Sequence, residues 1–228
     1  MTDGERSASR PRGGPSDAAV DDYLKTIYAH TEWQPAPITP SGLASKLGLA
    51  PSSVTEMVTK LVEQGLAERR PYGPVRLTDD GTQRALRVIR RHRLVETWLV
   101  EQMGYDWADV HDEAEVLEHV ISDRLLDSVD ARLGRPDVDP HGDAIPSSAG
   151  VVPVRPFLLL ADAPVGSAGR VLRIDDHEPA ALSWARAAGI RIGDALEATA
   201  DGVRTAGGTH YAVPGAAASA VWLSAPAA

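Results

Sequence analysis

Residues 41 to 78 contain the pattern that most restricts the fold of this chain. Two short segments, 41–47 and 52–64, repeat their apolar residues at helical spacing, and a glycine lies between them. Two strand-like segments, 66–70 and 75–78, follow around a Pro-Tyr-Gly-Pro sequence that is typical of a turn. Helix, turn, helix and β-hairpin in this order predict a winged helix-turn-helix. Such a motif places its second helix in the major groove of DNA.

The charge distribution agrees with a nucleic-acid partner, although the chain of 228 residues has a net charge of −9. The first 95 residues hold 14 Lys and Arg and 11 Asp and Glu, so this part carries +3 and the remainder −12. Base contacts require small polar residues at the start of the second helix, and phosphate contacts require cations nearby. The residues expected to meet these needs are Pro51, Ser52, Ser53, Thr55, Lys60, Arg69, Arg70 and Arg76. The alternative is an ordinary helical hairpin with a solvated charged face.

The absence of cysteine limits the chemistry of the chain. It excludes disulfides, iron–sulfur sites, thiolate zinc sites and a cysteine nucleophile, so a metal would need oxygen and imidazole ligands. No apolar run reaches the length of about 18 residues that a membrane span needs, and the N-terminus has no apolar signal region. We therefore expect a cytoplasmic protein with no membrane partner.

Histidine and carboxylate residues recur at helical spacing on the two segments that follow the hairpin. His92 and Glu96 lie four residues apart in a helix predicted over 78–103. A further helix predicted over 110–133 carries four such residues on one face, namely His111, Glu115, Glu118 and His119. Facing helices with such side chains build transition-metal sites in bundles. Each pair alone would be an ordinary surface ion pair, and His30 and His210, without such neighbours, are expected to be surface or satisfied histidines.

The chain divides by composition into a mainly α-helical part and a small β-rich part. We predict a disordered tail over 1–16, the winged helix-turn-helix over 17–78 and a helical domain over 79–146. A linker over 147–168 precedes a small β-barrel-like domain over 169–228, with one helix at 180–188.

Several motifs together resemble the diphtheria-toxin-repressor (DtxR) family of metal-dependent transcriptional repressors, and within it the manganese-responsive, MntR-like branch. The motifs are DDYLKTIY at 21–28, LAPSSVTEMVTKLVEQGL at 49–66, LTDDG at 77–81, RRHRLVETWL at 90–99, HDEAEVLEHVISD at 111–123 and PHGDAIP at 140–146. The segment 173–194 is similar to the family's C-terminal FeoA-type, SH3-like domain. The resemblance implies a palindromic double-stranded DNA operator bound by one or two homodimers.

The resemblance also implies two metal sites. Asp22, Glu115, Glu118 and His119 match the primary site, which switches the family's function. His92, Glu96 and His111 match the second site, to which the C-terminal domain donates a carboxylate; alignment places Glu178 there, with His177 and Asp175 as nearby substitutes.

The identity of two ligands favours Mn²⁺. Iron-responsive members have a methionine at the position of Asp22 and a cysteine at the position of Glu115, so both sulfur ligands are carboxylates in this chain. Hard oxygen ligands suit Mn²⁺, and Fe²⁺ remains chemically feasible. The predicted function is a Mn²⁺-activated dimeric repressor of metal-uptake genes that is not an enzyme. The alternatives are an iron-responsive repressor of the same family and, more distantly, a metal-dependent enzyme.

Overall fold

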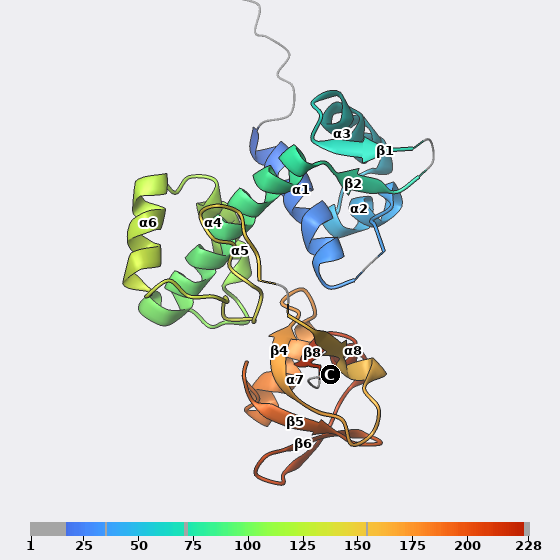
Figure 1. Ribbon diagram of the computed structural model, residues 1–228, viewed down its shortest axis with the longest axis vertical. Helices are drawn as coiled ribbons and strands as arrows, with labels where there is room; N and C mark the ends of the chain where they lie inside the picture. The colour runs from blue at the N-terminus through green and yellow to red at the C-terminus, as the bar shows by residue number, and fades with distance from the viewer. Residues whose placement is uncertain (1–16, 35, 71–72, 154, 226–228) are drawn as a thin grey trace, which may run out of the picture. The chain divides into compact units, whose positions relative to one another are not determined.

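The computed structural model describes residues 17–34, 36–70, 73–153 and 155–225 (Figure 1). The chain forms two compact units, and the boundary between them falls between Val88 and Ile89, within one long helix. The predicted tail 1–16 and two residues of the predicted hairpin turn, Pro71 and Tyr72, lie outside the described residues.

The N-terminal unit has the predicted winged helix-turn-helix. Its elements are α1 (Asp17–Glu32), α2 (Pro40–Leu47), α3 (Pro51–Glu63), β1 (Ala67–Arg69), β2 (Val75–Leu77) and the first part of α4 (Asp79–Met103). β1 and β2 pair antiparallel, with Glu68 opposite Arg76. The core forms where the apolar faces of the helices meet, and Leu24, Leu43 and Leu61 are fully buried in it. The apolar spacing read from the sequence thus corresponds to the buried face of each helix.

The second unit begins with the remainder of α4 and continues with α5 (His111–Glu118) and α6 (Asp123–Arg132). The prediction of one continuous helix over 110–133 was wrong. The hydroxyl oxygen of Ser122 accepts a hydrogen bond from the backbone N–H of Leu125 and so begins a new helix. The guanidinium of Arg91 donates to the carbonyl oxygens of Glu118 and Ile121 at 3.5 and 3.0 Å, which satisfies backbone groups at the break.

Some apolar residues of α4 to α6 are buried and others are exposed. Leu94, Leu99 and Leu126 are buried in the core that these helices form within one chain. Val116 on α5 and Leu125 on α6 are instead 66% and 49% exposed. Among the described residues, no helix combines the length and the apolar character that crossing a bilayer requires.

The C-terminal part of the second unit is a small antiparallel β-domain with three short helical segments. The elements are β3 (Phe157–Leu159), the 3₁₀ turn η1 (Leu160–Asp162), β4 (Ala168–Ile174), α7 (Pro179–Ala188), β5 (Ala195–Ala198), β6 (Gly202–Thr205), β7 (His210–Ala212), α8 (Gly215–Ala218) and β8 (Val221–Ser224). The strand order is β3-β8-β4-β5-β6-β7. α7 buries Ala181, Leu182 and Ala185 against the core of this domain.

The predicted linker over 147–168 contains part of this domain. β3 pairs with β8 in the sheet, and Leu160 of η1 is buried in the core, so the domain begins before residue 169. The strand was not predicted because it is only three residues long and lies in a segment rich in proline and glycine; Phe157 is exposed, and Leu158 and Leu159 are partly buried.

The loop between α6 and β3 is held in place by backbone contacts. Val138 and Ala144 form an isolated antiparallel bridge, and Asp139 accepts hydrogen bonds from two backbone N–H groups inside the loop. The loop is attached to the β-domain because the backbone N–H of Ile174 donates to the carbonyl oxygen of His141 at 3.0 Å. The guanidinium of Arg93 on α4 donates to the carbonyl oxygen of Ala144. The loop therefore lies beside both α4 and β4.

Candidate metal centre and DNA-binding surface

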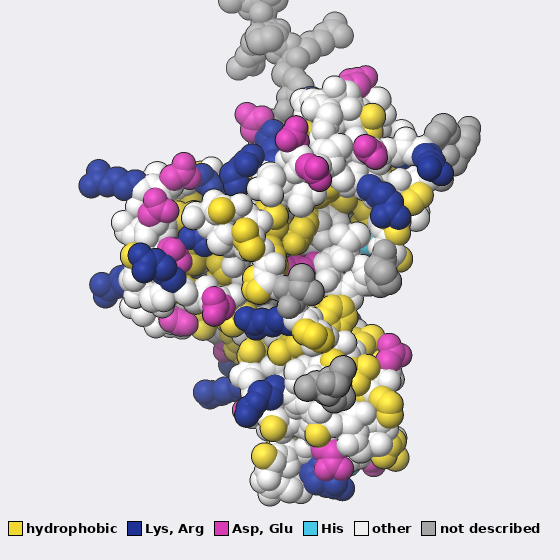
Figure 2. Space-filling model, in the orientation of Figure 1, with side chains coloured by type: hydrophobic (Ala, Val, Ile, Leu, Met, Phe, Trp, Pro, Cys, Tyr) yellow, Lys and Arg dark blue, Asp and Glu magenta, His cyan; other side chains and the backbone are white. Residues whose placement is uncertain are grey.

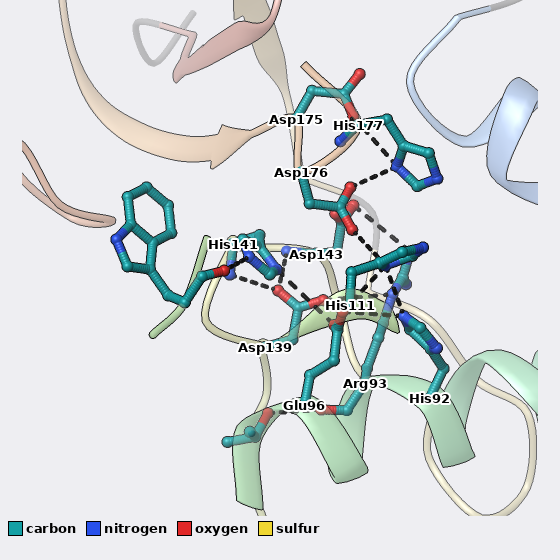
Figure 3. Close-up of polar contacts among 12 residues, drawn as sticks. His92, Arg93, Glu96, His111, Asp139, His141, Asp143, Asp175, Asp176 and His177 are labelled. Carbon is teal, nitrogen blue, oxygen red and sulfur yellow. Dashed lines mark hydrogen bonds and ion pairs between the residues drawn. The ribbon is translucent and has the colours of Figure 1, made fainter. Parts of the chain in front are cut away.

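Four potential ligands from three parts of the second unit converge in one cluster (Figure 3). α4 supplies His92 and Glu96 one turn apart, α5 begins with His111, and the loop after β4 supplies Asp176. The Glu96 Oε1 atom lies 3.0 Å from His92 Nε2 and 3.3 Å from His111 Nδ1, and Asp176 Oδ2 lies 3.1 Å from His111 Nδ1. This arrangement of two imidazoles and two carboxylates can hold a divalent transition metal.

The carboxylate that the β-domain places beside His111 is Asp176, which was not among the predicted ligands. The predicted Glu178 instead caps α7, since its side chain accepts a hydrogen bond from the backbone N–H of Ala180 at 3.2 Å. The alternatives His177 and Asp175 contact each other and lie beside the cluster, with 65% of the His177 side chain exposed. The Asp-Asp-His sequence was the available signal, but only the loop conformation decides which carboxylate faces His111.

Three residues assigned to the primary site by resemblance are adjacent to this cluster. Glu118, which is 1% exposed at the end of α5, has its Oε2 atom 2.6 Å from His92 Nδ1. Its other oxygen lies 3.5 Å from His119 Nε2, and Glu115 Oε1 lies 3.4 Å from His111 Nε2. The two sets predicted as separate sites are therefore neighbours that meet at His92.

The remaining predicted ligand, Asp22, belongs to α1 of the N-terminal unit. Its backbone carbonyl accepts a hydrogen bond from the Thr26 hydroxyl at 2.8 Å, as expected within a helix. Its assignment as a metal ligand stays a prediction from the resemblance.

A second group of buried polar residues surrounds Glu96 on its other side, and only His141 of its loop residues lies within the motif PHGDAIP. Glu96, Asp139 and His141 are each 5% exposed or less and could together hold an ion. Nearby, Arg173 of β4 donates to Asp143 at 2.8 Å. This ion pair crosses from the loop to the β-domain and fixes the end of β4 that precedes Asp176.

The electrostatics of the cluster show opposing charges at close range. Burial alone would disfavour protonated His111, but hydrogen bonds to Asp176 and Glu96 raise its pKa to about 10. Burial likewise opposes ionisation of Glu96, yet the neighbouring His92 and His111 hold the pKa of its carboxyl well below the usual range. The cluster therefore keeps carboxylates ionised and requires positive charge beside them.

Asp139 experiences the opposite environment. Burial, together with the charges of Asp143 and Glu96, raises the pKa of the Asp139 carboxyl to about 8. Several carboxylates in one buried region thus compete for the available protons and cations.

The residues predicted to contact DNA lie on α3 and on the β1–β2 hairpin. Pro51, Ser52, Ser53 and Thr55 are exposed in the first turns of α3, whereas Val54, Met57, Val58 and Leu61 face the core. Arg70 and Arg76 are exposed on the hairpin, Lys60 and Arg69 are partly exposed, and Arg69 Nε donates to the carbonyl oxygen of Gly73 at 3.2 Å. Over the described residues on the face shown in Figure 2, Lys and Arg are interspersed with Asp and Glu.

Two family descriptions match consecutive parts of the chain. Residues 18–75 match "Iron dependent repressor, N-terminal DNA binding domain", and residues 78–147 match "Iron dependent repressor, metal binding and dimerisation domain". The boundary between the two matches lies at the junction of β2 and α4.

Curated relatives agree with these matches. The diphtheria toxin repressor of Corynebacterium efficiens is 30% identical over 188 residues, which cover 77% of this chain and 80% of that protein. The iron-dependent repressor of Mycobacterium tuberculosis is 33% identical over 124 residues, and the match spans 54% of each chain.

Solved structures show the same likeness over nearly the whole chain. A manganese-dependent transcriptional repressor in complex with manganese is 40% identical, with a TM-score of 0.85, and the match covers 91% of this chain and 100% of that one. A manganese regulator named SloR is 30% identical, with a TM-score of 0.75 and coverage of 91% and 98%.

Proposed function

Since the chain belongs to the DtxR family of metal-dependent transcriptional repressors, we propose that it is a Mn²⁺-activated dimer that represses metal-uptake genes. The family consists of repressors rather than enzymes. The observation that carries the proposal is the ligand cluster formed by His92, Glu96, His111 and Asp176, with Glu118 against His92.

The donor chemistry fits Mn²⁺. All groups of the cluster are carboxylates and imidazoles, and the chain contains no cysteine. Such oxygen and nitrogen ligands suit Mn²⁺ by type, whereas thiolates would favour softer metals. The 40% identical manganese-dependent repressor supports the same choice, while the iron-dependent relatives make Fe²⁺ the second candidate.

The switching site that we propose consists of Glu115, Glu118, His119 and, by resemblance, Asp22. Bound Mn²⁺ supplies positive charge that offsets the repulsion among these three carboxylates. Because Asp22 belongs to α1 and the other three residues to the end of α5, metal binding would connect the DNA-binding domain with the helical domain. Operator DNA and Mn²⁺ should then each increase the affinity for the other by the same factor.

Dimerisation would set the spacing of two α3 helices for half-sites about one turn of DNA apart. We propose that the dimer surface includes Val116 and Leu125, which are 66% and 49% exposed. Residues 78–147 match a dimerisation domain, which supports this location. Ser52, Ser53 and Thr55 of α3 would face the bases and the hairpin arginines the phosphates.

Selection from a double-stranded DNA library, with and without Mn²⁺, tests the proposed function. Wild-type protein and Glu115→Ala are compared with Glu113→Ala, which removes an exposed carboxylate from the same helix. We expect Mn²⁺ to enrich a palindromic sequence with wild type and Glu113→Ala, and to have little effect with Glu115→Ala. Equal DNA affinity in all conditions would refute the proposal.

Iron as the physiological signal is the alternative that the iron-dependent relatives support. Titration of Fe²⁺ against Mn²⁺ under anaerobic conditions, with binding to the selected DNA as the readout, separates the two. Activation at lower free Fe²⁺ than free Mn²⁺ would assign the chain to the iron-responsive group.

A further inference from the structure

Two consecutive residues of α4 hold Glu118 at opposite ends. His92 Nδ1 lies 2.6 Å from the carboxylate of Glu118, which is buried. The preceding residue, Arg91, contacts the backbone carbonyl oxygen of Glu118 from its Nη1 atom at 3.5 Å. One helix therefore contacts both the side chain and the backbone of a residue assigned to the switching site.

The contacts of Arg91 extend over the turn that follows α5. The backbone N–H of Ile121 donates to the carbonyl oxygen of Leu117 at 2.9 Å, so this segment is a closed turn. Arg91 Nη1 donates to the carbonyl oxygen of Ile121 at 3.0 Å, which is the stronger of its two carbonyl contacts. Since Glu118 and His119 both belong to this turn, fixing its carbonyl groups also fixes the points from which the two side chains extend.

The guanidinium of Arg91 also forms an ion pair. Its Nη2 atom contacts the carboxylate of Asp123 in the first turn of α6. The Asp123 side chain is 84% exposed, so water screens this pair and the carbonyl contacts carry most of the constraint. A planar guanidinium presents donors in fixed directions and can hold these three acceptors together, whereas lysine has a single nitrogen on a flexible stem.

We propose that Arg91 is a positioning residue for the switching site. By holding the turn between α5 and α6, it keeps the side chains of Glu118 and His119 where one ion can bind both. Glu118 Oε1 and His119 Nε2 are 3.5 Å apart, which is close enough for such sharing. Groups that orient metal ligands without touching the metal commonly change metal affinity about 10- to 100-fold. The inference rests on the proposed function, because it takes Glu118 and His119 as ligands.

The competing explanation is that Arg91 only caps the end of α5. A cation near the last carbonyl groups of a helix stabilises that helix. In that case loss of Arg91 lowers the free energy of unfolding and leaves the Mn²⁺ affinity of the folded chain unchanged. Charge alone predicts a third result, since Arg91 repels a bound cation and its removal should increase Mn²⁺ affinity. Only the positioning role predicts weaker binding.

Three substitutions separate these effects. Arg91→Ala removes the guanidinium and its charge, whereas Arg91→Lys keeps the charge but reaches fewer of the three acceptors. Arg124→Ala is the matched control for charge, because Arg124 is exposed in the first turn of α6 and its side chain has no hydrogen bond or ion pair among the described residues. Near-ultraviolet circular dichroism of the full chain without metal checks that each variant folds.

The measurement is a titration of EDTA-treated protein with Mn²⁺, in which electron paramagnetic resonance reports the concentration of the free ion. Glu115→Ala identifies the binding step that belongs to the switching site. We expect Arg91→Ala to weaken that step at least about 10-fold, and Arg91→Lys to weaken it less. Arg124→Ala should leave the step unchanged or slightly stronger.

Unchanged or tighter binding by Arg91→Ala would overturn the inference, and so would an equal loss in Arg91→Ala and Arg124→Ala. If Arg91→Ala does not fold, Arg91→Lys decides, and wild-type affinity in that variant would overturn the inference. The titration needs no DNA, so it separates this inference from the proposed function. If Glu115→Ala leaves every binding step unchanged, the proposed switching site is refuted and the role of Arg91 with it. If Glu115→Ala weakens a step that Arg91→Ala does not, only the role of Arg91 is refuted.

Discussion

Gly142 lies where the loop after α6 meets β4, and replacing it should disturb both the fold and the metal cluster. Its φ is +93°, and a Cβ atom there would lie 1.9 Å from the carbonyl oxygen of Leu172, against 3.4 Å or more in ordinary contact. The Cβ is bonded directly to the backbone of residue 142 and the oxygen belongs to the backbone of Leu172, so no side-chain rotation can relieve the clash and the loop and β4 would have to separate by about 1.5 Å.

The cost of Gly142→Ala follows from the contacts that such a separation breaks. The left-handed conformation costs an alanine about 1–2 kcal/mol. Loss of the hydrogen bond from Ile174 N–H to the His141 carbonyl adds about 1 kcal/mol. The buried pair of Arg173 and Asp143 would also lengthen, and breaking such a pair completely costs about 3–5 kcal/mol. We expect a decrease in the free energy of unfolding of at least about 3 kcal/mol.

Gly193→Ala is the matched control. Gly193 has a φ of +92°, and nothing lies within 4 Å of the position of its Cβ. This variant should lose only the conformational cost of about 1–2 kcal/mol. Urea unfolding of the full chain in EDTA, followed by near-ultraviolet circular dichroism, measures both changes. Equal destabilisation by the two substitutions would show that the close approach to Leu172 is unimportant.

Four further predictions address the cluster, its helices and the DNA surface. Asp176→Asn should weaken Mn²⁺ binding at least about 10-fold, whereas Glu178→Gln should leave it unchanged in a calorimetric titration; the reverse result would restore Glu178 as the ligand. Because the pKa of His111 is raised to about 10 without metal, Mn²⁺ must displace its proton at pH 7. Apparent affinity should therefore rise between pH 6 and 8, with proton release in buffers of different ionisation enthalpy, and a flat profile would contradict this. Ser122→Ala should destabilise the chain by about 1 kcal/mol in urea unfolding through loss of the α6 cap. Arg76→Ala should lower DNA affinity and reduce the salt dependence of binding by about one phosphate contact, and an unchanged salt slope would exclude Arg76 from the interface.

Local sequence patterns predicted α1 to α4 and the donor chemistry. The apolar spacing in α1 to α4 corresponds to the buried face of each helix, because each helix packs through one stripe of its surface. His92 and Glu96 lie side by side because residues four apart in a helix are neighbours on its surface. The absence of cysteine limited any metal site to oxygen and nitrogen ligands.

Contacts between segments distant in sequence decided the rest. The helix predicted over 110–133 ends at Glu118 because Arg91, from another helix, satisfies carbonyl groups at the break. β3 exists as a strand because it pairs with β8 at the other end of the domain. No local periodicity encodes such partners.

The composition of the metal cluster shows the same division. The sequence by itself determined which residue types could bind a metal and that α4 and α5 present them. Only the tertiary structure decided that Asp176 rather than Glu178 faces His111, and that His141 and Asp139 lie beside Glu96. A side chain in a loop points where the packing and hydrogen bonds of that loop direct it, and these depend on segments far away in the chain.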